Sequence, residues 1–226
     1  MTNPESDGLF DNDWDDCGEL SWTEADWQKY LANQETAVRD YIKHYDQLPA
    51  SMDRIDEAAR RMGWELAATD SPEALDDDED LDEAAEIFDG PWDPYTLHRN
   101  PVYISTRALY LSLLAHWERV AAQPGRVPPA LGITLQGLLY RGHEQALQAV
   151  QALEMGDYTL AVVLFKRALR ELNLTLARLN EADAAETPLA VRFREYAQPR
   201  LFDLREIWLR VMNECRQNHG GTIQPE

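Results

Sequence analysis

Apolar residues recur every three or four positions through most of this chain, which is the period of an amphipathic helix. The pattern predicts six main helices, over residues 21–48, 51–66, 101–123, 129–155, 157–180 and 187–217. No stretch shows sustained alternation of apolar and polar residues between hairpin turns, as half-buried strands would. The sequence therefore predicts an all-α fold.

Capping residues, glycine and proline set the expected boundaries of these helices. Ser21 and Glu24 have the spacing of a capping box, and Asn100, followed by proline, is typical of a helix start. Gly156 predicts a turn between two long helices. Pro199 lies inside the last helix and is expected to kink or interrupt it, because proline lacks the backbone N–H.

The helices fall into two groups. Residues 101–217 hold four helices joined mostly by short turns, which favours an antiparallel bundle. Two further helices occupy residues 21–68. The remaining segments are expected to be irregular: an acidic loop or disordered segment over 1–20, an acidic and aromatic linker over 69–100 with one short helix over 81–88, and a flexible tail over 218–226.

The formal net charge of −20 arises in the first half of the chain. Residues 1–100 hold 28 Asp and Glu against 7 Lys and Arg, whereas residues 101–226 hold 13 against 14. Such a field opposes binding to nucleic acid and to anionic membranes. It favours a protein partner with a basic surface, or a cation, and the plainer alternative is that it serves solubility.

Several features indicate a cytoplasmic protein. The two cysteines, Cys17 and Cys215, lie far apart and suggest neither a disulfide framework nor a zinc site. No apolar stretch approaches the roughly 20 residues that span a bilayer. The first residues, MTNPESDGLFDND, lack the positive charge and the apolar stretch of a secretory signal.

The stretch EMGDYTLAVVLFKRAL, residues 154–169, resembles the second helix of a tetratricopeptide repeat. The matching residues are Gly156, Asp157, Tyr158, Ala161, Phe165, Ala168 and Leu169. The resemblance implies that the glycine makes a turn and that the two alanines let a pair of helices approach closely. It covers about residues 142–173 without a second copy, and arrays of such repeats need about three. We expect one antiparallel helical hairpin, and no family is recognised for the whole chain.

The stretch DWDDCGELSWTE, residues 13–24, is similar to the calcium loop of an EF-hand. Asp13, Asp15, Glu19 and Glu24 stand at ligand positions around the glycine that the loop requires. Cys17 replaces one ligand by a soft thiol that hard cations avoid, and no helix is predicted before the loop. We expect this segment to bind calcium weakly or not at all, and to be an acidic loop that ends in a helix cap.

Other patterns for metal chemistry are incomplete. A carboxylate-bridged metal site in a bundle uses Glu-x-x-His pairs, and none of the five histidines has an acid three residues before it. DEAAE (residues 82–86) and EMGD (residues 154–157) resemble the magnesium motifs of helical nucleotide pyrophosphatases. The second stretch straddles a predicted turn, so its carboxylates would not share a helical face.

The aromatic stretch PWDPYTLHRNPVY, residues 91–103, leads into the first bundle helix. Two interpretations of Trp92, Tyr95 and Tyr103 stay open. These residues pack the linker onto the bundle, or they line a groove for a partner, since aromatic residues are enriched at protein interfaces.

These patterns favour a cytoplasmic helical protein without enzymatic activity that acts as a protein–protein interaction or scaffold module. The sequence has no nucleophile elbow, P-loop, dinucleotide fingerprint or zinc spacing, although sites assembled in space leave no local motif. The alternative is a metal-dependent helical enzyme or a calcium-linked module that uses acidic residues. No cofactor is expected, with calcium or another divalent cation as the alternative, and no oligomeric state is predicted.

Overall fold

The computed structural model describes residues 22–64, 97 and 99–220 of the chain. These residues form seven α-helices and contain no strand, which confirms the all-α prediction. The helices are α1 (Glu24–Asp46), α2 (Arg54–Arg61), α3 (Pro101–Ala121), α4 (Pro129–Glu154), α5 (Tyr158–Leu179), α6 (Ala182–Ala185) and α7 (Pro188–Gly220).

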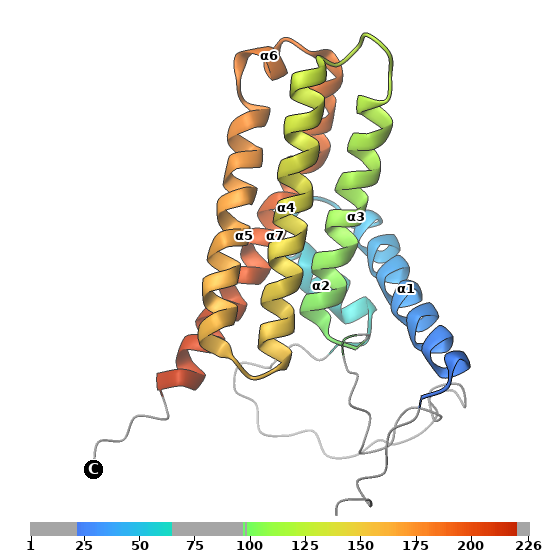
Figure 1. The fold of residues 1–226 in the computed structure, drawn as a ribbon, viewed down its shortest axis with the longest axis vertical. Helices are drawn as coiled ribbons and strands as arrows, with labels where there is room; N and C mark the ends of the chain where they lie inside the picture. The colour runs from blue at the N-terminus through green and yellow to red at the C-terminus, as the bar shows by residue number, and fades with distance from the viewer. Residues whose placement is uncertain (1–21, 65–96, 98, 221–226) are drawn as a thin grey trace, which may run out of the picture.

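Four long helices form an antiparallel bundle, as predicted (Figure 1). Helix α3 contacts α4, α4 contacts α5, α5 contacts α7, and α7 closes the ring on α3. Short connections reverse the chain between consecutive helices. Among the described helices, the most extensive contact is the one between α4 and α5.

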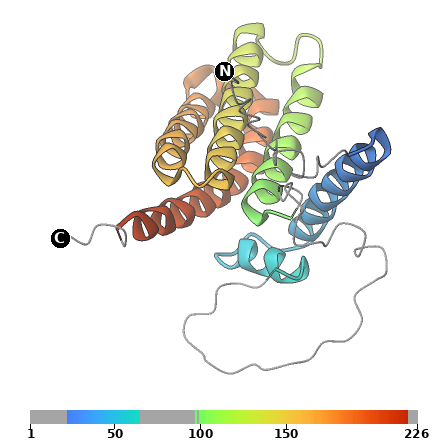
Figure 2. The same ribbon diagram turned by 60° about the horizontal axis from the view of Figure 1, so that its bottom comes forward.

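Helix α1 lies along the outside of the bundle against α3, and α2 packs on α1 (Figure 2). Val38, Tyr41 and Tyr45 of α1 belong to the same hydrophobic core as the bundle. Earlier on the same helix, Trp27 and Leu31 are 37% and 51% exposed. The later turns of α1 are therefore part of the core, whereas its first turns carry exposed apolar side chains.

The start of α1 differs from the prediction. The helix begins at Glu24 and is capped by Thr23 rather than by Ser21. The Asp26 N–H donates to Thr23 Oγ1 at 3.3 Å, and the Thr23 N–H donates to Asp26 Oδ2 at 2.9 Å. Ser21 with Glu24 and Thr23 with Asp26 both have capping-box spacing. The second pair lies directly at the helix start and satisfies two backbone N–H donors. Glu24 is therefore not the capping residue that the sequence indicated.

Helix α2 is shorter than predicted. It spans eight residues and is followed by Gly63, whose φ of 73° is a left-handed conformation that glycine adopts without a side-chain clash. Met52, which lies in the predicted range but before the helix begins, is 94% exposed. The buried apolar residues of α2 are Ile55 and Ala58.

Helices α4 and α5 form the expected hairpin. Gly156 turns the chain with a φ of 76°, and Asp157 caps α5 by accepting the Leu160 N–H at 2.9 Å. Ala161 and Ala168 are fully buried. Helix α5 runs on past residue 173, where the resemblance to a tetratricopeptide repeat ends.

The chain between α5 and α7 contains the short helix α6, which has only four residues and carries no periodic pattern. Arg178 of α5 holds it through bonds of 2.6 and 2.7 Å to Asp183. Helix α7 is not interrupted at Pro199. A proline removes one backbone hydrogen bond, and the packing of α7 against α3 and α5 keeps the rest of the helix in place.

Candidate interaction site

A groove opens where α2 meets the ends of α3 and α7. Its cavity volume is about 560 Å³, within the range of roughly 300–1,000 Å³ that is usual for ligand pockets. The apolar part of its lining includes Ile55, Ala59, Trp64, Val102, Ile207 and Val211. Asp56, Ser105, Arg210 and Glu214 supply polar groups.

The helical period explains how these residues reach one groove. Ile55 and Ala59 are four residues apart on α2, and Ile207 and Val211 are four apart on α7, so each pair lies on one helical face. Trp64 follows α2, and its ring stacks on Tyr41 of α1 with 5.5 Å between the ring centroids. The groove thus has one wall from the N-terminal helices and one from the bundle.

A buried polar cluster attaches α2 to α7 close to the groove. Arg54 donates from Nε and Nη2 to Asp203 Oδ2 at 2.9 and 2.7 Å, and the Tyr45 hydroxyl donates to the same oxygen at 2.6 Å. Arg54 is 7% exposed, and its guanidinium carbon lies 4.2 Å from the centroid of the Tyr45 ring. Burial, together with the Asp203 carboxylate, raises the pKa of Tyr45, so its hydroxyl remains a donor.

Two further ion pairs join the N-terminal helices to α7. Arg210 binds Asp56 at the edge of the groove with an Nη1–Oδ1 distance of 2.5 Å. Arg200 binds Asp46, the last residue of α1, also at 2.5 Å, and its guanidinium lies 3.6 Å from the centroid of the Tyr196 ring. Together with the pair between Arg54 and Asp203, these contacts fix the position of the outer groove wall.

One of the four calcium candidates lies within the described residues. Asp13, Asp15 and Glu19 lie outside them. Glu24 is the exposed first residue of α1 and accepts a bond from Gln28 Nε2 at 3.4 Å. In the described part of the chain, no three His, Cys, Asp or Glu side chains gather as metal ligands. Weak or absent calcium binding by the N-terminal segment stays a prediction.

The aromatic candidates are divided in the same way. Trp92 and Tyr95 lie outside the described residues. Tyr103 is 5% exposed and belongs to the core, and its hydroxyl accepts a hydrogen bond from Arg107. From the same stretch, the neighbouring residues Pro101 and Val102 line the groove.

Nothing in the local sequence marks the Arg54–Asp203 cluster, because its members lie 149 positions apart. The separate pair between Arg200 and Asp46 does leave a signal in the sequence. Arg200 stands in the same helical stripe as Leu204 and Trp208, and all three are buried. A charged residue in an apolar stripe requires a partner that compensates its burial.

None of the helices in the described residues combines the length and the apolar character that crossing a bilayer requires. Comparison with protein families, curated proteins and solved structures finds no match to this chain. The groove and the charges near it are therefore the basis on which a function can be proposed.

Proposed function

We propose that this protein is a non-enzymatic interaction module that binds a segment of a partner protein in the groove between α2, α3 and α7. The supporting observation is the groove itself, whose lining is largely apolar and also includes the charged residues Asp56, Arg210 and Glu214. Protein interfaces have this arrangement of an apolar core within a polar rim. The fixed outer wall would let a partner bind without reorganising α2.

The distribution of charge favours a basic partner. The chain leaves the groove at Trp64 and is described again from Leu97, shortly before α3. Residues 65–96 hold thirteen Asp and Glu and no Lys or Arg. Because this acidic segment connects Trp64 to the start of α3, its charge would accelerate association of a basic segment with the groove. The proposed ligand is an apolar anchor flanked by Lys or Arg.

We also propose a cytoplasmic location. Cys215 on α7 is 2% exposed and forms no disulfide. Burial raises the pKa of its thiol, which keeps the thiol protonated and unreactive. A buried thiol of this kind is compatible with a reducing compartment.

Peptide selection against the full-length chain tests the groove. A display library of random peptides is selected on the wild-type protein, and the binders are then measured on Ala59→Arg, which places a long cationic side chain in the groove. We expect the selected peptides to combine apolar anchors with Lys or Arg. Their affinity for Ala59→Arg should be lower by about tenfold, which is roughly 1.4 kcal/mol, and should fall with added salt.

Ala32→Arg is the matched control, because Ala32 is exposed on α1 outside the groove and the charge change is the same. Thermal melts show whether both variants fold. Equal loss of binding in the two variants, or selection of acidic peptides, would contradict the proposal.

A further inference from the structure

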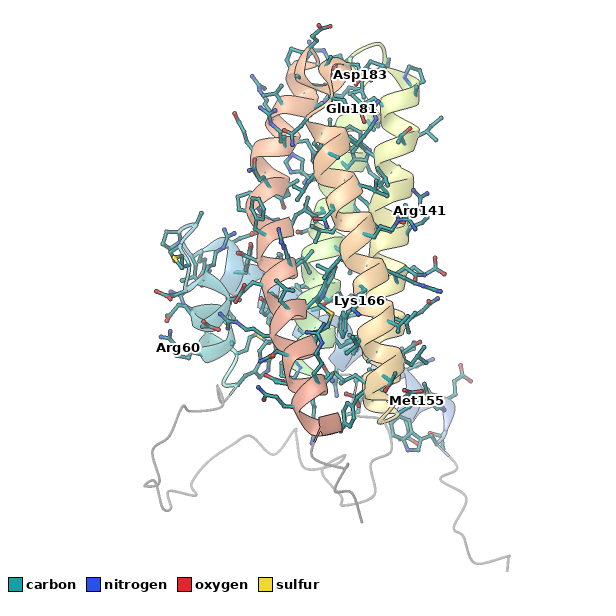
Figure 3. The ribbon with its side chains drawn as sticks, turned by 90° about the vertical axis from the view of Figure 1, so that its left-hand side faces the viewer. Arg60, Arg141, Met155, Lys166, Glu181 and Asp183 are labelled. Atoms are coloured by element: carbon teal, nitrogen blue, oxygen red, sulfur yellow. The ribbon has the colours of Figure 1, made fainter. Side chains whose placement is uncertain are left out.

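The side of α5 that faces away from the bundle carries a row of cations among exposed apolar residues. Lys166, Arg167 and Arg170 are exposed, and their spacing of three and four residues places them on one helical face. Val163 before them and Leu174 after them are 44% and 42% exposed. Figure 3 looks onto this side of the bundle and labels Lys166.

This face has no carboxylate that balances its charge. Glu171 is the one acidic residue of α5, and its side chain, which is 17% exposed, binds Arg141 of α4 at 3.0 Å. Within the described residues, Lys166, Arg167 and Arg170 form no ion pair. The three cations therefore remain available to an external anion.

Other helices of this protein show how such cations are balanced. Glu57 binds Arg60 and Arg61 on α2, and Glu206 binds Arg210 on α7. On α5, by contrast, Arg170 follows Lys166 by four residues and Arg167 by three. Like charges at these spacings destabilise a helix. A partner that supplies carboxylates would remove this repulsion.

A shallow hollow in the same face offers an apolar contact between the cations. Its volume is about 520 Å³, and its lining is Lys166, Leu169, Arg170, Asn173, Leu174 and Ala177. The guanidinium of arginine matches a carboxylate through two parallel hydrogen bonds. The face therefore combines anion recognition with a place for an apolar side chain.

We propose that this outward face of α5 binds an acidic segment of a partner protein, with carboxylates on Arg167 and Arg170 and an apolar side chain against Leu174. Nucleic acid and anionic membranes present long arrays of negative charge, which a chain of formal net charge −20 repels. An acidic peptide brings only a few charges. Screening over about 8 Å at physiological salt lets the local cations dominate its binding.

Fluorescence anisotropy on the full-length chain tests this site. The probe is a labelled peptide of four Leu-Glu-Glu-Ala repeats, and the reference is the neutral peptide of Leu-Gln-Gln-Ala repeats. We expect the acidic probe to bind more tightly. The double variant Arg167→Glu with Arg170→Glu should weaken its binding by at least roughly tenfold, and the conservative double variant to Lys should weaken it less, because the charge is kept.

Two controls separate this site from its alternatives. Arg126→Glu with Arg216→Glu changes the net charge equally at other exposed positions and should leave binding unchanged, as should Ala59→Arg in the groove. Equal weakening in the Arg126 and Arg216 variant would overturn the proposal. So would tighter binding of a single-stranded oligonucleotide or of phosphatidylserine vesicles at this face. A dimer that the α5 variant abolishes would identify a second copy as the occupant and would overturn it too.

Discussion

The α4–α5 hairpin and the attachment of α2 to α7 are held together by different kinds of contact. The hairpin joins neighbours in sequence through apolar packing, with Ala161 and Ala168 fully buried. The attachment joins residues 149 and 154 positions apart through the pairs Arg54–Asp203 and Asp56–Arg210. The first kind of contact is non-directional and depends on volume. The second kind is directional, and each charged side chain depends on one oppositely charged partner.

The difference follows from the free energy of burying each kind of side chain. Burying an apolar side chain is favourable by itself. Burying the Arg54 guanidinium is unfavourable unless its partner is present, so a buried ion pair fixes a position more than it adds stability. Variants of the core should therefore destabilise the whole molecule, and variants of the attachment should act on α1 and α2.

Trp208→Ala should produce the largest effect, because it breaks the centre of the bundle. Trp208 is fully buried, and its ring stacks on that of Tyr110 with 6.0 Å between the ring centroids. Its Nε1 donates a hydrogen bond to Thr106 Oγ1 at 3.1 Å. We expect a loss of about 3–5 kcal/mol in the free energy of unfolding, measured in urea. Leu209→Ala, at a residue that is 41% exposed on the same helix, is the control. Unfolding confined to α1 and α2 would contradict the comparison.

Asp203→Ala should break the attachment. The side chain of Asp203 is 19% exposed, so we expect a loss of about 2–3 kcal/mol, somewhat below that for a fully buried pair. Amide hydrogen exchange should accelerate in α1 and α2 and stay slow in α4 and α5. Asp183→Ala removes an exposed partner of Arg178 and should destabilise the protein much less, because exposed ion pairs contribute little. Uniform acceleration in Asp203→Ala would show that the two regions are not separable.

Ala168→Leu should overpack the hairpin. Ala168 is fully buried, and added methyl groups in a packed core cost about 1–3 kcal/mol. Ala177→Leu at an exposed position of the same helix is the control. Equal thermal midpoints for wild type and Ala168→Leu would contradict the close approach of α4 and α5 that the repeat-like sequence implies.

His143→Leu should make the free energy of unfolding less dependent on pH. Burial lowers the pKa of His143 to about 4, and its Nε2 has no partner among the described residues. The unfolded chain takes up this proton near pH 6.5, so stability is fully present above that pH and is lost as pH falls toward 4. The expected difference between pH 7 and pH 5 is about 1–2 kcal/mol. An unchanged slope in His143→Leu would refute the assignment.

Thr23→Ala should have the smallest effect, about 1 kcal/mol, through loss of the helix cap. Ser21→Ala, at the position that the sequence pattern favours as the cap, should leave stability unchanged. Circular dichroism during thermal unfolding measures both. A larger loss of stability in Ser21→Ala than in Thr23→Ala would favour Ser21 and Glu24 as the capping box.

Contacts between residues close in sequence were predictable, and contacts between distant residues were not. The long bundle helices follow from apolar periodicity and from local signals such as Asn100 and Gly156, because those signals act between residues close in sequence. Choosing Thr23 over Ser21 as the cap requires knowing which pair lies at the helix end. The groove could not be predicted, since Ala59 and Ile207 come from helices about 150 positions apart. For Tyr103 the sequence left open packing onto the bundle and contact with a partner, and its place in α3 turns it into the core.

The separation between Arg54 and Asp203 has a consequence for synthesis. Helices α1 and α2 leave the ribosome first, but their partner on α7 is made 149 residues later. At about 5–20 residues per second this interval is roughly 8–30 s. The two helices of the α4–α5 hairpin, by contrast, are synthesised within a few seconds of each other. The Arg54 guanidinium therefore stays in water until α7 emerges, so the attachment of α2 to α7 cannot form before the last helix is made.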